Sequence, residues 1–398
     1  MTELEPHAIE AWLLSFVRPD APRRAEARET ARALFAALEH PQDRVRAVHV
    51  VGTAGKGTTA RLIADTLRRR GDTVGLHLSP HVHDIRERFT VTDELPGWDD
   101  VAAAATEIDS VLADLPRPTF FAVTAAMAYV LARRADTDWL VVEAGIGGEA
   151  DATNTFGRSD VVTVVTAVGL DHQDVLGDTL AEIAAAKAGV LAGRRVAVLG
   201  PQPAPAAGEV VHAVAAQHGV RLEGVPGRGD WRRDAELVAA AAVAELVDDA
   251  PVPIFVAQPG RFETHSAVPG RWILDGAHNP MKLATLAASL ASEPRPRLGI
   301  IAIGAGKDLD ACAAAIAPAL DRVIAVTFGP SPGEFGPAGH PAAAVAAALE
   351  QAGVVDVEVA SDATLAANRA RELTEPVTVV ATGSFMHLTA VREVLQGG

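Results

Sequence analysis

Short apolar segments of strand length alternate with amphipathic helical segments along most of the chain. The segments 47–52 (AVHVVG), 73–80 (TVGLHLSP), 139–145 (WLVVEAG) and 161–172 (VVTVVTAVGLDH) are typical of buried strands. Between the first two, residues 58–71 have helical periodicity and end in glycine. This alternation predicts an α/β fold with a mostly parallel sheet.

The alternation restarts close to Gln258 and continues to the end of the chain. Apolar segments there are again separated by helical ones, which predicts a second, smaller α/β unit of about five strands. We therefore predict two domains, 1–257 and 258–398. The segment 200–229 is rich in proline and glycine, and we expect connecting or peripheral structure in it.

Charge and composition narrow the possible functions. The net charge of −16 argues against nonspecific binding to nucleic acid or to an anionic membrane. A phosphate group would therefore have to be held by local devices such as loop amides, a lysine or a metal. No apolar run is long enough to cross a bilayer, and the segment 1–10 lacks the apolar core of a signal peptide. The single cysteine, Cys312, excludes an intramolecular disulfide framework, and we expect a cytoplasmic protein.

A glycine-rich loop, 52–58 (GTAGKGT), follows the first predicted strand and leads into the first predicted helix. Glycines let backbone amides approach phosphate oxygens, and the start of the helix is positively polarised. Lys56 would add a charge, and Thr58 a hydroxyl group for a metal ion. A glycine between this lysine and hydroxyl departs from the common phosphate-binding pattern. We favour a nucleotide site over a simple turn with a solvated lysine.

Two later strand ends carry possible metal ligands. Glu143 ends one apolar segment, and Asp171 and His172 end another. Because the carboxyl ends of parallel strands share one edge of a sheet, these side chains are expected near the loop. Mg²⁺ takes few protein ligands, which suits this sparse set. The alternatives are a surface acid and a histidine that caps a helix.

Lys187 lies on an apolar helical stripe with Leu180, Ile183 and Val190. A lysine there is costly unless its amine is paired or modified, although the side chain could also extend to solvent. A desolvated lysine with a lowered pKa could react with CO₂ to form a carbamate. In the second domain, the segment 273–280 (ILDGAHNP) forms a polar turn after a strand, a role that turn-forming residues also fill structurally.

In order along the chain, these motifs resemble the folylpolyglutamate synthase/dihydrofolate synthase family of the Mur ligase superfamily. The resemblance is carried by HVVGTAGKG, SPHVHDIRERF, FFAVTAAMAY, VVEAGIGGEADATN, TAVGLDHQDVLGDTLAEIAAAKAGV, PGRFE, LDGAHNP, GAGKDLD and TGS. It implies a P-loop-type ATPase domain followed by a Rossmann-like domain. It also implies an ATP- and Mg²⁺-dependent ligase that activates an acid as an acyl phosphate and joins it to L-glutamate.

The resemblance also implies roles for individual residues. Catalytic roles fall to Lys56, Lys187 as a carbamylated lysine, and His278. Metal ligands would be Thr58, Ser79, Glu143, His172 and Lys187. Nucleotide binding is implied for Gly52, Thr53, Gly55, Lys56, Gly57, Thr58, Asp234, Arg261 and Asp275. Substrate binding is implied for Phe120, Phe121, Asp151, Ala152, His278 and Asn279. Potassium is a further expected cofactor, and we expect a monomer.

Four departures from the family pattern are divided between the nucleotide side, with Ala54 and Asp234, and the acceptor side. Ala54 and Asp234 stand where the family usually has asparagine, Glu149 stands where it usually has arginine or lysine, and residues 18–28 replace its G-L-x-R element. These departures leave open a ligase of the same mechanism that acts on a non-folate acid. A nucleotide-binding regulator without catalysis is a further alternative.

Overall fold

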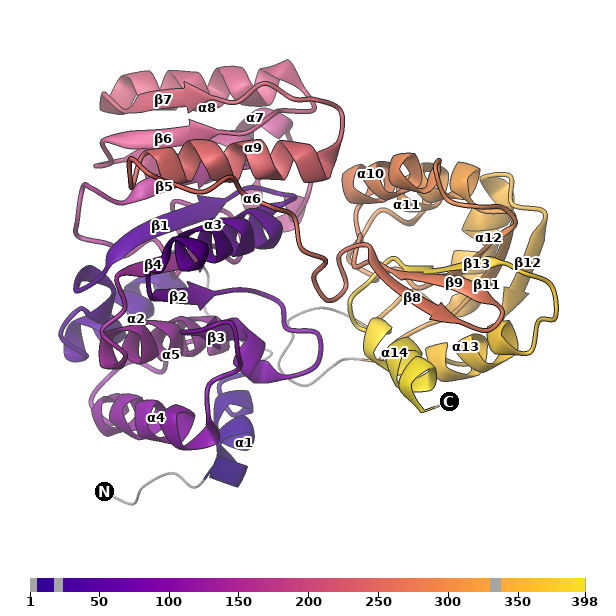
Figure 1. Ribbon diagram of the computed structural model, residues 1–398, viewed down its shortest axis with the longest axis horizontal. Coiled ribbons are helices and arrows are strands. Elements are labelled where there is room, and N and C mark those ends of the chain that lie inside the picture. Colours follow the sequence, from indigo (N-terminus) through magenta and orange to yellow (C-terminus); the bar gives the residue numbers. More distant parts are fainter. Residues whose placement is uncertain (1–5, 18–23, 330–337, 398) are drawn as a thin grey trace. The chain divides into compact units, whose positions relative to one another are not determined.

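The computed structural model describes residues 6–17, 24–329 and 338–397. Contacts within the chain divide it into a first unit, 1–256, and a second unit, 257–398, each built on its own sheet (Figure 1). The segment 18–28, which replaces the family's acceptor-side element, lies partly outside the described residues, since they resume at Arg24.

The first unit contains a seven-stranded sheet with the order β3-β2-β4-β1-β5-β6-β7 among the described residues. All neighbouring strands are parallel except β2 and β3. The strands are β1 (Arg46–Val51), β2 (Val74–His77), β3 (Phe89–Thr90), β4 (Trp139–Glu143), β5 (Val162–Val165), β6 (Val196–Leu199) and β7 (Arg221–Gly224). Because β1 lies between β4 and β5, the loops after these three strands emerge side by side at one edge.

Helices cover both faces of this sheet. On one face lie α3 (Lys56–Arg70) and α9 (Trp231–Ala244) (Figure 1). They share a hydrophobic cluster with the alternate side chains Val48 and Val50 of β1. On the other face lie α1 (Ile9–Leu14), α2 (Arg24–Ala37), α4 (Trp98–Leu112), α5 (Phe120–Arg134), α7 (Leu180–Ala188) and α8 (Pro205–His218). The short α6 (Gln173–Leu176) precedes α7, and the 3-10 helices of this unit are η1 (Pro6–Ala8), η2 (Pro41–Asp43), η3 (Ile85–Arg88) and η4 (Gly189–Leu191).

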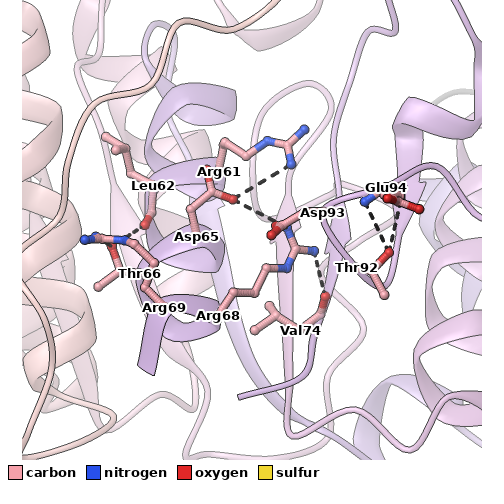
Figure 2. Close-up of polar contacts among 10 residues, drawn as sticks. All are labelled: Arg61, Leu62, Asp65, Thr66, Arg68, Arg69, Val74, Thr92, Asp93 and Glu94. Atoms are coloured by element: carbon pink, nitrogen blue, oxygen red, sulfur yellow. Dashed lines mark hydrogen bonds and ion pairs between the residues drawn. The ribbon is translucent and has the colours of Figure 1, made fainter. Parts of the chain in front are cut away.

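The glycine-rich loop 52–58 is called the phosphate loop below, after its predicted role. The helix that follows it, α3, is held along its outer side by polar contacts (Figure 2). Asp65 lies 3.9 Å from Arg61 and 3.4 Å from Arg68. Arg68 also pairs with Asp93 at 3.1 Å and donates to the backbone oxygen of Val74 at 2.8 Å. Burial raises the pKa of Asp65, against the opposing effect of the two arginines. These contacts join the helix to β2 and to the segment after β3.

In the part of the second unit that the structure describes, a six-stranded sheet has the order β12-β11-β10-β13-β9-β8, parallel except for the pair β8 and β9. Its strands are β8 (Glu263–Ala267), β9 (Gly270–Leu274), β10 (Arg297–Ile301), β11 (Arg322–Ala325), β12 (Asp356–Val359) and β13 (Thr378–Thr382). Its helices are α10 (Pro280–Leu290), α11 (Leu309–Ile316), α12 (Ala342–Gln351), α13 (Ala363–Arg371), α14 (Leu388–Gln396) and the 3-10 helix η5 (Ala317–Ala319). Two mostly parallel α/β sheets confirm the predicted fold class.

Two segments contain more regular structure than the sequence predicted. The segment 200–229, expected to be connecting or peripheral structure, contains α8 and the edge strand β7. Pro205 occupies the first turn of α8, where a missing N–H costs nothing, so proline there starts a helix. The second unit has one more strand than expected, because the polar β8 was not recognised. It lies at the sheet edge with alternating partial exposure, and so it lacks an apolar signal.

Candidate active site

The phosphate loop is shaped by glycines that no other residue could replace without strain. Gly52 follows β1 with a φ of 147°, and a Cβ atom there would lie 2.0 Å from the Thr166 Oγ1 atom. Gly55, with a φ of 83°, is the N-cap of α3. The Thr53 N–H donates to the Ala167 oxygen at 2.8 Å. The loop is therefore fixed against the segment that follows β5, and Gly55 forms the N-cap at which α3 begins.

The segment after β5 carries two of the predicted site residues. The Thr53 hydroxyl donates to the Gly169 oxygen at 3.0 Å, and the Gly169 N–H lies 3.1 Å from the same hydroxyl. His172 has a left-handed backbone at the N-cap of α6, and its N–H donates to the Asp171 carboxylate at 3.1 Å. Asp171 is buried, whereas the His172 side chain is 34% exposed. These contacts connect the His172 loop to the phosphate loop.

Glu143 is the carboxylate at the centre of the site. It ends β4 opposite Val50 of β1 and is only 3% exposed. Its Oε2 atom accepts the Ser79 N–H at 2.8 Å, and its Oε1 atom lies 3.9 Å from the Lys56 Nζ atom. A Cβ atom at Gly57 would lie 3.1 Å from Oε2, so the first turn of α3 approaches the carboxylate directly. The structure thus brings Lys56, Gly57, Ser79 and Glu143 together.

Lys187 is buried, with 2% of its surface exposed, so it does not extend to solvent. Its amine donates to the Gly52 oxygen at 2.9 Å, which connects α7 to the phosphate loop. A Cβ atom at Gly148 would lie 2.4 Å from the Lys187 backbone oxygen, so the loop after β4 also runs against α7. The hydrogen bond offsets part of the cost of burying this amine.

The predicted metal ligands fit an ion that needs few protein donors. Among the described residues, no group of three or more His, Cys, Asp or Glu side chains is placed to hold a metal ion. Of the predicted ligands Thr58, Ser79, Glu143, His172 and Lys187, three are oxygen donors: the buried carboxylate of Glu143, Ser79, whose N–H contacts it, and Thr58, which is buried in the first turn of α3. His172 and Lys187 lie on segments that contact the glycine-rich loop, at Thr53 and Gly52. Mg²⁺ prefers such oxygen donors and keeps waters and phosphate oxygens as further ligands. The donor set therefore suits Mg²⁺ bound together with a nucleotide.

The two predicted aromatic residues of the acceptor site lie at the start of α5. Phe120 is buried, with the Arg88 guanidinium 5.2 Å from the centre of its ring. The Phe121 ring packs against His77 with 5.4 Å between ring centres. A Cβ atom at Gly145 would lie 2.8 Å from Phe121 ring carbons. Phe121 therefore contacts the loop that follows β4, whereas Phe120 belongs to the core.

Asp151 organises its own loop. Its carboxylate accepts the Ile146 N–H at 2.8 Å, the Thr153 N–H at 3.0 Å and the Thr153 hydroxyl at 2.6 Å. The next residue, Ala152, is buried. The His49 Nε2 atom lies 2.8 Å from the Thr153 hydroxyl, and burial lowers the pKa of His49 to about 3. His49 therefore supports this loop from β1, a contact that the sequence analysis did not predict.

Asp234 holds the segment that precedes α9. Its Oδ1 atom accepts the Arg228 N–H at 2.6 Å, and it lies in the first turn of that helix. A carboxylate is favourable there because the start of a helix is positively polarised. The residue that departs from the family pattern thus has a structural role in this chain.

The predicted site residues of the second unit lie before β8, at Arg261, and between β9 and α10, at Asp275, His278 and Asn279. Asp275 accepts N–H groups from Phe262 and Ala277, each at 2.8 Å. The ring of Phe385 lies 4.2 Å from the Arg261 guanidinium and 6.1 Å from the His278 ring centre. The Phe385 ring thus contacts both Arg261 and His278. Sequence reasoning did not predict this aromatic residue.

Two further side chains complete the start of α10. Asn279 is the N-cap and accepts the Lys282 N–H at 2.9 Å. The Lys282 amine lies 3.0 Å from the His278 Nε2 atom. Lys282 was also missed, since a lysine in a helix gives no signal of its partner.

Comparison with known proteins supports a ligase. Residues 260–385 match the family described as Mur ligase, glutamate ligase domain. The chain is 31% identical to the folylpolyglutamate synthase of Lacticaseibacillus casei, over 92% of this chain and 93% of that protein. It is 34% identical to a probable bifunctional folylpolyglutamate synthase/dihydropteroate synthase of Halobacterium salinarum, over 92% of this chain but only 49% of that protein. The structure of Mycobacterium tuberculosis folylpolyglutamate synthase complexed with ADP superposes with a TM-score of 0.86, at 25% identity over 98% of this chain and 99% of that one.

Fold, phosphate loop and buried carboxylate thus define an ATP-dependent ligase of the Mur ligase type. Within that class, the chain belongs to the folylpolyglutamate synthase/dihydrofolate synthase family. The predicted family and enzyme class are confirmed. Among the described residues, no helix has both the length and the apolar character that a membrane crossing requires.

Proposed function

We propose that this chain uses ATP to join L-glutamate to the carboxylate of dihydropteroate or of a reduced folate. The observation that carries the proposal is the group formed by Lys56, Ser79 and Glu143 at the phosphate loop of a chain from this family. The relative from L. casei is named for folylpolyglutamate synthesis, and the similar M. tuberculosis structure holds ADP.

The reaction has two steps. A carboxylate oxygen of the acceptor attacks the γ-phosphorus of ATP, and the bond to ADP breaks to leave an acyl phosphate. The amine of glutamate then attacks the acyl carbon, phosphate leaves, and the nitrogen loses a proton to give the amide. Lys56 and the loop amides of Gly55 and Gly57 would neutralise the charge on the transferring phosphoryl group. Mg²⁺ held by Thr58, Ser79, Glu143 and His172 would supply further positive charge at the phosphates.

Lys187 is proposed to act as a carbamate. The ammonium would lose one proton, and the neutral amine would add to CO₂ and lose a second proton. This would turn a buried cation into an anion, which could support a cation at the phosphate loop. A carbamate nitrogen keeps one N–H, so the bond to the Gly52 oxygen can persist. Potassium is a second proposed cofactor.

The remaining roles concern the substrates. Phe121, Asp151 and Ala152 would shape the acceptor pocket, with Phe120 supporting it from the core. Asp234, Arg261 and Asp275 are proposed for nucleotide binding, and His278 and Asn279 for the glutamate side. We propose that the enzyme acts as a monomer in the cytoplasm.

A second candidate is a ligase of the same mechanism that acts on another acid. It is favoured by Glu149, an exposed acidic residue in the loop that also carries Asp151. The Glu149 backbone oxygen accepts hydrogen bonds from Arg28 at 2.7 Å and Asn154 at 3.0 Å. The loop is therefore held in place with a negative side chain where the family usually has a positive one.

The test is a phosphate-release assay with ATP, L-glutamate and a panel of acids, with product masses measured by mass spectrometry. We expect turnover with dihydropteroate or a reduced folate and a mass gain of one or more glutamates. Lys56→Met should abolish turnover, whereas Arg61→Met, a matched change on the outer side of the same helix, should not. Turnover with a non-pterin acid alone would favour the second candidate. ATP binding without any product would favour a regulator.

A further inference from the structure

His278 is contacted at both ring nitrogens. Its Nδ1 atom lies 2.7 Å from the Gly276 oxygen, and its Nε2 atom lies 3.0 Å from the Lys282 amine. A carbonyl oxygen only accepts, so Nδ1 must carry a proton. A lysine ammonium only donates, so Nε2 must present its lone pair. The two contacts together specify a neutral ring with its proton on Nδ1.

We propose that Lys282 is a positioning residue that holds His278 in this tautomer. Hydrogen bonds at one ring nitrogen decide the protonation of the other, so the ammonium selects the form with a bare Nε2. The positive charge 3.0 Å away also opposes a second proton on the ring.

The local fold keeps the two side chains together. Lys282 follows His278 by four residues and lies in the first turn of α10, where Asn279 accepts its N–H. On the other side, the Phe385 ring packs edge-on against His278 at an interplanar angle of 61°. A Cβ atom at Gly276 would lie 2.0 Å from the Phe385 ring, so glycine is required for this packing. The His278 ring is thereby confined while Lys282 contacts its Nε2 atom.

Only the kinetic consequence rests on the proposed function. If His278 acts on the glutamate side of the ligase reaction, its Nε2 atom is available as an acceptor as long as Lys282 holds the tautomer. Lys282 would then affect turnover through His278, without contacting the nucleotide.

The tautomer is tested by nitrogen–proton correlation spectra of the full chain labelled with ¹⁵N-histidine, with His278 assigned by the signal lost in His278→Gln. We expect the Nδ1–H pattern in the unmodified protein and in Lys282→Arg. Lys282→Met should shift the signal toward the doubly protonated form, because the Gly276 oxygen still accepts the Nδ1 proton while Nε2 no longer faces an ammonium. Arg369→Met, which removes a partly exposed cation elsewhere in the unit, should change nothing. An Nε2–H ring in the unmodified protein, or an unaltered signal in Lys282→Met, would overturn the proposal.

Kinetics supply the second readout. Lys282→Met should lower kcat on the order of tenfold, as loss of a histidine's hydrogen-bond partner commonly does, while the KM for ATP stays within about twofold. Lys282→Arg should restore most of the rate. Unchanged kcat in Lys282→Met would refute the positioning role. An unmodified protein that makes no product would instead count against the proposed function, and the spectra would still decide the tautomer.

Discussion

Replacing Lys187 by methionine or by alanine distinguishes the contribution of this side chain to packing from its proposed role in ligation. In Lys187→Met the hydrogen bond to the Gly52 oxygen is lost, which costs roughly 1.5–3 kcal/mol for a charged donor. Removing a buried cation relieves a desolvation penalty of similar size, so the net change in unfolding free energy should stay within about 2 kcal/mol. Compared with the methionine variant, Lys187→Ala also removes one buried methylene, the sulfur and the terminal methyl, three heavy atoms at roughly 0.8 kcal/mol each. The alanine variant should therefore be less stable than the methionine variant by about 2.4 kcal/mol.

Calorimetry and ligation assays test the two effects separately. A difference of this size should lower the melting temperature of Lys187→Ala by roughly 5–10 °C relative to Lys187→Met. Both variants should lose ligation by on the order of a hundredfold or more, because neither can form a carbamate. Acetate or formate should partly rescue only the alanine variant, since the methionine side chain fills the space.

Three results would contradict this reasoning. Full ligation by Lys187→Met would show that no charge is needed at the site. Equal rescue of both variants would show that the added acid acts elsewhere. Equal melting temperatures would mean that the space vacated in the alanine variant is refilled by its surroundings.

Three further predictions concern the same unit. Gly52→Ala should weaken ADP binding in calorimetric titration and cost about 1–3 kcal/mol of stability, since its Cβ would lie 2.0 Å from Thr166 and its φ is 147°. The pKa of His49 is lowered to about 3 by burial, so only the unfolded chain takes up this proton between pH 6.5 and 3. Lowering the pH from 7 to 5 should therefore reduce the free energy of unfolding by about 2 kcal/mol through this residue. In His49→Gln, the free energy of unfolding measured in urea should lack this part of the pH dependence. Asp93→Asn should change the unfolding free energy by less than about 1 kcal/mol, because its side chain is 77% exposed. Arg68→Met should cost more in the same urea titration, because Arg68 is nearly buried and also donates to a strand carbonyl.

The sequence predicts best those parts of the molecule that have a periodic apolar pattern or that end at a glycine. Apolar segments that end at a glycine predicted β1 and β4, and the loop between β1 and α3 followed from Gly52 and Gly55. The grouping of Glu143 with that loop followed from a general property of parallel sheets, whose strand ends share an edge. The edge strand β8 was missed because its side chains alternate between partial burial and exposure without an apolar face.

Contacts between side chains are harder to predict, because two residues that are distant in sequence produce no periodic pattern that would reveal their contact. His49 and Thr153 are far apart in the chain, yet their contact links β1 to the loop organised by Asp151. Lys282 shows the same limit at short range, since helical spacing allows its contact with His278 but does not require it. Motifs locate the reacting groups, whereas the protonation state of each group depends on neighbours that motifs do not include. The tautomer of His278 is thus the kind of property that a family resemblance leaves undetermined and that the contacts of this chain specify.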